Sequence, residues 1–290
     1  MLFCLLALAG LGACGEDAPT PARAPEPPPE VREEPPASAQ PEVPAEPPPL
    51  REAREVRIPT ADVTLVGDLR VGDSISAPLV VLVHQLSSTR DEWEPLLRHL
   101  GADPALTTFA LDMRGHGAST ERARGGATLD WQSFQTRQWE AVADDLRATL
   151  GHLREEEGLQ PSRVALVGSS IGSSAVIRAA AEDESVDALV ALSPGRAYRG
   201  VDALTPLPQL GERPFFVVAS RGEAPSAETA QDMARIAGGG ELLLVDGDRH
   251  GVAMFEASPD ALTRVATFLR EQLAGAAPAP EDAPPTEEGP

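Results

Sequence analysis

The residues best suited to do chemistry in this sequence are a serine, a carboxylate and a histidine, each of which follows an apolar stretch. Ser170 lies in the pentapeptide Gly168-Ser169-Ser170-Ile171-Gly172, directly after the apolar run 164–167. A G-x-S-x-G sequence after a strand is the layout of a nucleophile elbow. There the serine occupies a sharp strand-to-helix turn, and the glycines keep the crossing backbones from colliding. The simpler alternative is that Ser170 only caps the helix that follows.

A carboxylate and a histidine that could activate Ser170 follow it along the chain. An alkyl hydroxyl is a poor nucleophile at neutral pH, so it needs a nearby base, and the base needs an acid that fixes its tautomer. Glu223 lies in the loop after the apolar run 215–219, and His250 follows the last predicted strand. The predicted catalytic set is therefore Ser170, Glu223 and His250. The alternatives are a surface histidine and a solvated carboxylate, the usual situations of these residue types.

Three aspartates are possible substitutes for Glu223. Asp246 and Asp248 lie too close to His250 in sequence to be preferred, and Asp202 comes from the preceding loop. We favour Glu223 because it follows a strand directly, at the edge where a parallel sheet gathers its active-site loops.

From residue 56 onward, strand-like and helix-like segments alternate. Most strand candidates are continuous apolar runs, which is typical of strands buried on both faces of a parallel sheet. We therefore predict an α/β fold, with a mostly parallel twisted sheet and helices on both faces. The strand candidates are 62–66, 79–84, 107–111, 163–167, 187–192, 214–219 and 241–245, and the helix candidates are 91–100, 132–153, 171–182, 226–237 and 258–273. Region 56–75 suggests a short antiparallel meander with Gly67 and Gly72 at its turns.

Two further stretches carry a family resemblance. Asp112–Ser119 reads D-x-R-G-H-G-x-S, and Val80–Leu86 is an apolar strand that ends in His84-Gln85-Leu86. Together with the pentapeptide and the order serine, glutamate, histidine, they resemble the α/β-hydrolase superfamily over residues 56–274. The resemblance implies an oxyanion hole made by the backbone N–H groups of Leu86 and Ile171. It also implies a structural role for His116 and a reaction that needs no metal or organic cofactor.

The chain departs from the family pattern at three places. Gln85 stands where glycine is common, which leaves open whether the turn is tighter or Gln85 faces the site. Glu223 replaces the commoner aspartate. Only the short segment 193–213 separates two predicted strands where many family members insert a helical cap, so we expect no large cap domain. The walls of an open site would then come from residues 86–93, 115–131 and 194–210.

The composition disfavours several other functions. The formal net charge is −21, and all 24 basic residues are arginine. Without lysine there is no Schiff base, no pyridoxal attachment and no Walker-type phosphate lysine. A negative chain is a poor partner for nucleic acid. No cluster of His, Asp and Glu has the spacing of metal ligands, which disfavours a metal-dependent hydrolase. The expected partner is a small-molecule acyl substrate, with a monomer as the default state.

The two ends of the chain differ from the predicted domain. Residues 1–13 form an apolar run that is too short to span a bilayer and is followed by Cys14. The sequence Leu11-Gly12-Ala13-Cys14 resembles the lipobox of bacterial lipoproteins. The resemblance implies that residues 1–13 are a lipoprotein-type signal peptide and that the protein is exported, lipidated at Cys14 and anchored in the bacterial cell envelope. The alternatives are an uncleaved anchor and a cloning remnant. Residues 14–55 and 275–290 are rich in Pro, Glu and Ala, so we predict a disordered tether and a disordered acidic tail.

The sequence thus predicts a lipid-anchored serine hydrolase that acts on an ester or a related acyl bond through an acyl-enzyme. A peptidase or an acyltransferase would use the same residues. The alternative from another class is a non-catalytic, membrane-tethered binding or scaffold protein on a hydrolase fold.

Overall fold

The computed structural model describes residues 49–101 and 103–274. The expected signal peptide, Cys14, most of the expected tether and the acidic tail lie outside these residues. Of the helices in the described ranges, none is long and apolar enough to cross a membrane.

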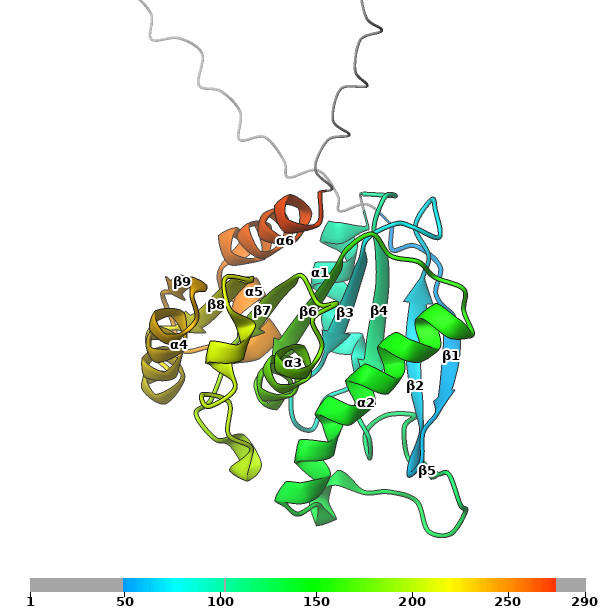
Figure 1. The fold of residues 1–290 in the computed structure, drawn as a ribbon. Helices are drawn as coiled ribbons and strands as arrows, with labels where there is room; N and C mark the ends of the chain where they lie inside the picture. The colour runs from blue at the N-terminus through cyan, green and yellow to red at the C-terminus, as the bar shows by residue number, and fades with distance from the viewer. Residues whose placement is uncertain (1–48, 102, 275–290) are drawn as a thin grey trace, which may run out of the picture. The chain divides into compact units, whose positions relative to one another are not determined.

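One twisted sheet organises the described residues, and most of it is parallel (Figure 1). The strand order is β1-β2-β4-β3-β6-β7-β8-β9, and β5 pairs with β2. Neighbours from β4 to β9 are parallel, whereas β1, β2 and β5 are antiparallel additions at one edge. The strands are β1 (Arg54–Pro59), β2 (Val63–Arg70), β3 (Leu79–Val83), β4 (Thr107–Asp112), β5 (Glu121–Arg122), β6 (Val164–Ser169), β7 (Ala188–Leu192), β8 (Pro214–Ser220) and β9 (Gly239–Val245). The predicted fold class is confirmed.

Helices cover both faces of this sheet. One face packs against α2 (Thr136–Glu155), α3 (Ile171–Glu182) and α4 (Ala224–Ile236). The other packs against α1 (Glu94–Leu100), α5 (Met254–Ala257) and α6 (Pro259–Leu273). Side chains alternate between the faces along each strand, so Val81 of β3 faces α2 and α3 while Leu82 faces α1 and α6. The central strands are continuously apolar because both of their faces are covered.

The prediction of a turn at Gly67 is wrong. Gly67 lies inside β2, where it pairs with Val56 on one side and Leu111 on the other. A Cβ atom at this position would overlap the ring of Phe109 and the carbonyl oxygen of Ala110. Glycine is needed there for close packing across the sheet rather than for chain reversal. Gly72 does lie beyond β2, in the connection to β3.

The first strand begins earlier than predicted, and the segment between β7 and β8 is short. β1 begins at Arg54, inside the stretch 14–55 that was expected to be tether. Its Val56 and Ile58 are buried at alternate positions, so the domain begins earlier than residue 56. The segment 193–213 contains two 3-10 turns, η3 (Tyr198–Gly200) and η4 (Leu207–Leu210), and no α-helix.

Candidate active site

Ser170 occupies the sharp turn between β6 and α3, as the pentapeptide predicts. Its backbone angles are φ 55° and ψ −118°, which residues other than glycine rarely adopt. Its N–H donates to Leu192 O at the end of β7 over 2.8 Å. Its side chain makes no capping hydrogen bond with α3. The strained turn is therefore not explained by helix capping, and strain of this kind is typical of functional sites.

The two glycines of the pentapeptide make the turn possible. A Cβ atom at Gly168 would overlap the backbone of Gly172, and one at Gly172 would overlap the carbonyl oxygen of Val83 in β3. The backbones of β6, α3 and β3 thus meet more closely than any larger residue allows. This is the crossing that the sequence pattern predicts.

His250 and Glu223 lie together on the loops after β9 and β8. The distance from His250 Nδ1 to Glu223 Oε1 is 2.5 Å. The His250 side chain is 36% exposed and that of Glu223 24%, so the pair is shielded but reachable. The two loops are also joined by their backbones, because the N–H of Gly222 donates to Gly247 O over 2.7 Å.

The loop that carries His250 packs closely against the end of the sheet at Gly251. Its φ is 58°, and a Cβ atom there would overlap the side chains of Gln85 and Ser169. Its N–H donates to Ser193 Oγ over 2.8 Å. Because Ser169 precedes Ser170, the backbone next to His250 packs against the turn that carries Ser170. The sequence left open whether the turn is tighter or Gln85 faces the site. In the structure the Gln85 side chain packs against Gly251 in the loop that carries His250.

Among the hydrogen bonds of the described residues, none joins Ser170 Oγ to the His250 ring. The structure nevertheless brings both residues to the end of β7, since Ser170 N–H binds Leu192 and the residue after His250 binds Ser193. Hydrogen bonds of this kind are often long before substrate binds and tighten in the substrate complex.

Leu86 and Ile171 lie on neighbouring elements beside Ser170. Leu86 is in the turn after β3, and Ile171 is the first residue of α3, where the helix dipole favours negative charge. Within the described residues, neither backbone N–H donates to another protein group. Both N–H groups thus remain without a protein acceptor among the described residues.

A buried glutamate, which the sequence analysis did not identify, supports the turn that carries Leu86. Gln85 N–H donates to Glu92 Oε1 over 3.0 Å. The second carboxylate oxygen of Glu92 is buried without a partner among the described residues. Burial raises the pKa of Glu92 to about 7, although hydrogen bonds from Ser88 and Gln85 act in the opposite direction.

His84 and His116 lie in the interior rather than at the serine. The Nδ1 of His84 is 2.7 Å from Gln85 O, and its Nε2 accepts a hydrogen bond from Met113 N–H over 2.9 Å. Burial lowers the pKa of His84 to about 3. His116 stacks on Trp131, with ring centroids 5.2 Å apart, and burial also lowers its pKa. Both rings are neutral parts of the scaffold.

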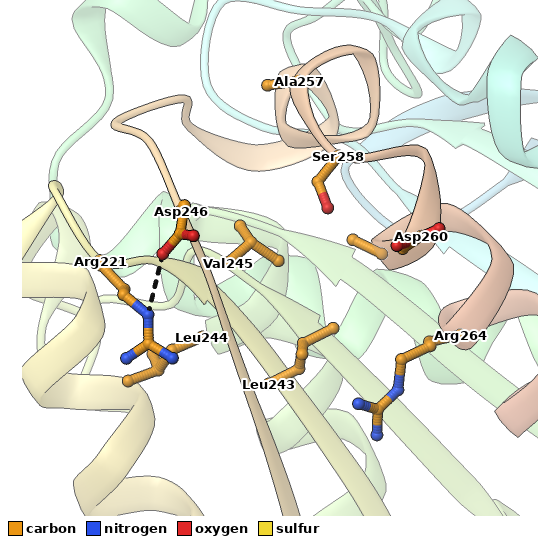
Figure 2. A pocket seen from close by; sticks show the side chains of 10 residues that line it. Arg221, Leu243, Leu244, Val245, Asp246, Ala257, Ser258, Asp260 and Arg264 are labelled. Carbon is orange, nitrogen blue, oxygen red and sulfur yellow. Dashed lines mark ion pairs between the residues drawn. The ribbon is translucent and has the colours of Figure 1, made fainter. Parts of the chain in front are cut away.

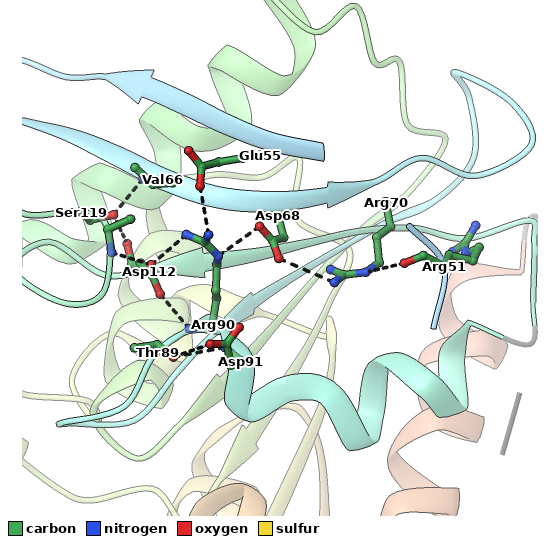
Figure 3. A network of polar contacts seen from close by, with 11 residues as sticks. Arg51, Glu55, Val66, Asp68, Arg70, Thr89, Arg90, Asp91, Asp112 and Ser119 are labelled. Atoms are coloured by element: carbon green, nitrogen blue, oxygen red, sulfur yellow. Dashed lines mark hydrogen bonds and ion pairs between the residues drawn. The ribbon is translucent and has the colours of Figure 1, made fainter. Parts of the chain in front are cut away.

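The loop after β4 is held by the polar network in Figure 3. Asp112 accepts hydrogen bonds from Arg90 N–H at 2.8 Å, from Arg90 Nη1 at 2.9 Å and from Ala118 N–H at 2.8 Å. Ser119 Oγ donates to Asp112 O and accepts from Val66 N–H. The D-x-R-G-H-G-x-S stretch thus fixes the loop through its aspartate and serine.

The alternative acids do not contact His250. Asp246 is 99% exposed, pairs with Arg221 at 3.2 Å and faces the pocket of Figure 2. Asp248 is exposed, and Asp202 accepts the N–H of Leu204. Of the carboxylates considered, Glu223 is therefore the one beside the histidine.

Several cavities lie outside the predicted catalytic set. One of about 450 Å³ runs between β9 and the start of α6 and is lined in part by Arg221, Leu243 and Arg264 (Figure 2). Another, of about 370 Å³, lies beside the start of α2 and is lined in part by Arg122, Arg124 and Arg137. The described residues hold no group of three or more His, Cys, Asp and Glu side chains that could bind a metal ion.

Comparisons with known proteins agree with this architecture. A family model described as alpha/beta hydrolase fold matches residues 78–222. No curated protein matches the sequence. A similar solved structure is an esterase of Pyrococcus furiosus, with 21% identity, a TM-score of 0.61 and coverage of 77% of this chain and 93% of that chain. Another is a dienelactone hydrolase of Anabaena variabilis, with 21% identity, a TM-score of 0.57 and coverage of 77% and 97%.

A predicted CIB-like hydrolase of Thermoplasma acidophilum is also similar, with 18% identity, a TM-score of 0.59 and coverage of 76% of this chain and 99% of that chain. At these identities the likeness shows the fold alone. The family model goes further, because it spans half of the chain and includes β3, the serine turn and β8. The chain therefore belongs to the alpha/beta hydrolase fold family.

Proposed function

We propose that the protein is a serine hydrolase that cleaves a carboxylic ester or a related acyl bond through an acyl-enzyme. Ser170 attacks the acyl carbonyl, His250 takes the serine proton and passes it to the leaving group, and Glu223 orients His250. The observation that carries the proposal is the contact of 2.5 Å between His250 Nδ1 and Glu223 Oε1, beside the strained serine turn. A carboxylate at Nδ1 leaves Nε2 as the base.

The backbone N–H groups of Ile171 and Leu86 would stabilise the oxyanion of the tetrahedral intermediate. Preorganised donors of this kind act only as charge develops, and removal of one such donor typically slows catalysis by about 100-fold or more. The proposal is supported by the position of Ile171 at the first turn of α3 and by the anchoring of the Leu86 turn through Glu92.

Three features favour an ester over other acyl substrates. The segment 193–213 contains only two short 3-10 turns, which would leave the serine accessible to small substrates of varied shape. The similar structures include proteins named as an esterase, a dienelactone hydrolase and an N-acyl homoserine lactonase. Esters also need less activation than amides, which suits an open site that does not exclude water.

The test is hydrolysis of p-nitrophenyl esters of graded acyl length by wild type, Ser170→Ala and the control Ser174→Ala. Ser174 lies in the first turn of α3, directly after the serine turn, and its buried hydroxyl has no hydrogen-bond partner in the described residues. We expect Ser174→Ala to retain activity and Ser170→Ala to lose about 10,000-fold or more in kcat. Equal rates for wild type and Ser170→Ala would contradict the proposal. Absence of activity in wild type across the series would favour the non-catalytic binding protein.

A further inference from the structure

Tyr198 lies at the proposed site although no sequence motif marks it. It is the one tyrosine of the chain and comes from η3 in the segment 193–213. Its ring meets the His250 ring edge to face, with centroids 6.3 Å apart and planes at 78°. Its hydroxyl is 3.4 Å from Ser193 O, and the side chains of Ser226 and Ser170 lie close enough to lower its pKa.

The backbone around Tyr198 is fixed by close packing. A Cβ atom at Gly195 would overlap the Tyr198 ring, so glycine lets the chain pass directly beneath that ring. Arg199 has a positive φ of 52°, and its guanidinium lies 5.9 Å from the centre of the Trp139 ring in α2. Ser226 Oγ donates to Pro194 O over 2.8 Å, which ties the start of the segment to α4. The hydroxyl is therefore held in place rather than carried on a loose loop.

Tyr198 lies on the opposite side of Ser170 from the turn that carries Leu86. In the sheet, β6 lies between β3 and β7. Leu86 follows β3, whereas Tyr198 follows β7 on the side of the loops that carry Glu223 and His250. Tyr198 therefore lies on the histidine side of Ser170 rather than on the side of Leu86. It adjoins the histidine, which is the group that delivers a proton to the leaving oxygen.

We infer that Tyr198 is a catalytic residue that donates a hydrogen bond to the leaving-group oxygen of the ester. The inference rests on the proposed function. In acylation, Ser170 Oγ bonds to the carbonyl carbon and its proton passes to His250 Nε2. The carbon–oxygen bond to the leaving group then breaks, and that oxygen takes the proton from His250. Tyr198 stabilises the negative charge on the oxygen during this step and keeps its own proton.

The surroundings of Tyr198 suit a donor that stays protonated. Burial and the negative charge of Glu223 raise its pKa, although the side chains of Ser226 and Ser170 act in the opposite direction. The hydrogen bond from the Tyr198 hydroxyl to Ser193 O is long for an O–H donor. Little free energy is therefore lost when the hydroxyl leaves Ser193 O and donates to a developing alkoxide instead.

The test is the dependence of kcat/KM on the leaving group in wild type and Tyr198→Phe. The esters share one acyl group and differ in the alcohol, from p-nitrophenol to a simple alkanol. An acidic phenol leaves without help, whereas a basic alkoxide needs a donor. We expect Tyr198→Phe to lose about 10- to 100-fold on the alkyl ester and less than about 3-fold on the p-nitrophenyl ester, the loss typical of a hydrogen bond to a charged group. Phenylalanine keeps the ring, so thermal unfolding should change little.

Arg196→Ala is the matched control, because it breaks an exposed ion pair with Asp232 in the same segment without removing a hydroxyl. It should leave the leaving-group dependence unchanged. An equal loss by Tyr198→Phe on all esters, or no loss on any, would overturn the inference. If Ser170→Ala is inactive while Tyr198→Phe shows the wild-type dependence, the inference alone fails. If Ser170→Ala hydrolyses the esters at wild-type rates, the proposed function fails and the inference with it.

Discussion

The loops at the carboxyl edge of the sheet fall into two groups with similar residues and different surroundings. The anchored loops follow β3 and β4 and comprise residues 84–92 and 112–119. The site loops follow β7, β8 and β9 and comprise residues 193–213, 220–226 and 246–253. Both groups contain histidines and carboxylates, and both border Ser170.

His84 and Asp112 of the anchored loops differ from His250 of the site loops in how many of their polar atoms have fixed partners. Both ring nitrogens of His84 are bonded to backbone groups, and Asp112 accepts three hydrogen bonds. His250, in contrast, has Glu223 at Nδ1 and keeps Nε2 for another group. A polar group whose bonds are all made within the protein stabilises the fold, whereas one with a bond to spare can act on a substrate. Residue type alone therefore does not tell a scaffold histidine from a proposed base.

The largest effect should come from the site loops. We expect Glu223→Gln to lower kcat about 1,000-fold or more, because the amide no longer favours the tautomer and charge that His250 needs. Asp246→Asn is the matched control, since Asp246 is fully exposed and makes no contact with His250. Ester hydrolysis by both variants checks the comparison, and equal activity of the two would remove Glu223 from the mechanism.

The second largest effect should be a loss of stability when a buried ion pair of the anchored loops is broken. Arg114 Nε and Nη2 bind the two oxygens of Asp145 at 2.5 and 2.6 Å, and both side chains are buried. Asp145→Asn leaves the arginine charge without its partner, so we expect a loss of about 3 kcal/mol in the free energy of unfolding. Asp62→Asn removes only an exposed charge 3.8 Å from Arg114 and should cost less than about 0.5 kcal/mol. Urea unfolding of both variants measures the difference; similar losses would show that burial does not set the strength of this pair.

The smallest effect concerns Glu92. Its second carboxylate oxygen is buried without a partner among the described residues, unlike the polar atoms of His84 and Asp112. Its pKa in the folded protein is about 7, against an ordinary value of 4.5. Between these values the folded state binds a proton that the unfolded state has released, so the stability from this group falls as pH rises. The variant Glu92→Gln cannot ionise at this position. The difference in free energy of unfolding between this variant and wild type should therefore shift in favour of the variant by on the order of 2 kcal/mol between pH 5 and pH 8. Unfolding curves at the two pH values test this, and parallel behaviour of both proteins would refute it.

Much of the fold and of the candidate site could be predicted because the signals are local. Continuous apolar runs located β3, β4, β6, β7 and β8 to within one or two residues. The turn at Ser170 followed from two glycines at fixed spacing, since the steric need for them arises within a few residues. The order of Ser170, Glu223 and His250 could be read because each lies in the turn or loop that follows a strand.

What was missed depends on contacts between distant residues. Gly67 resembled a turn glycine, but the reason for it is the ring of Phe109 on the neighbouring strand. Tyr198 lies in a short segment without periodicity, and its place beside His250 depends on Gly195, Trp139 and Ser226. Glu92 lies in the predicted helix 91–100, and only the folded structure shows it buried against the turn of Leu86. Lipidation of Cys14 stays a prediction.

The most direct measurement is covalent labelling by a fluorophosphonate, which reacts with an activated serine and forms a stable adduct. The variants are wild type, Ser170→Ala and Ser174→Ala, and the readouts are intact mass and the site of attachment. The account predicts one adduct on wild type and on Ser174→Ala, located at Ser170, and none on Ser170→Ala. Equal labelling of wild type and Ser170→Ala, or attachment at another serine, would contradict it.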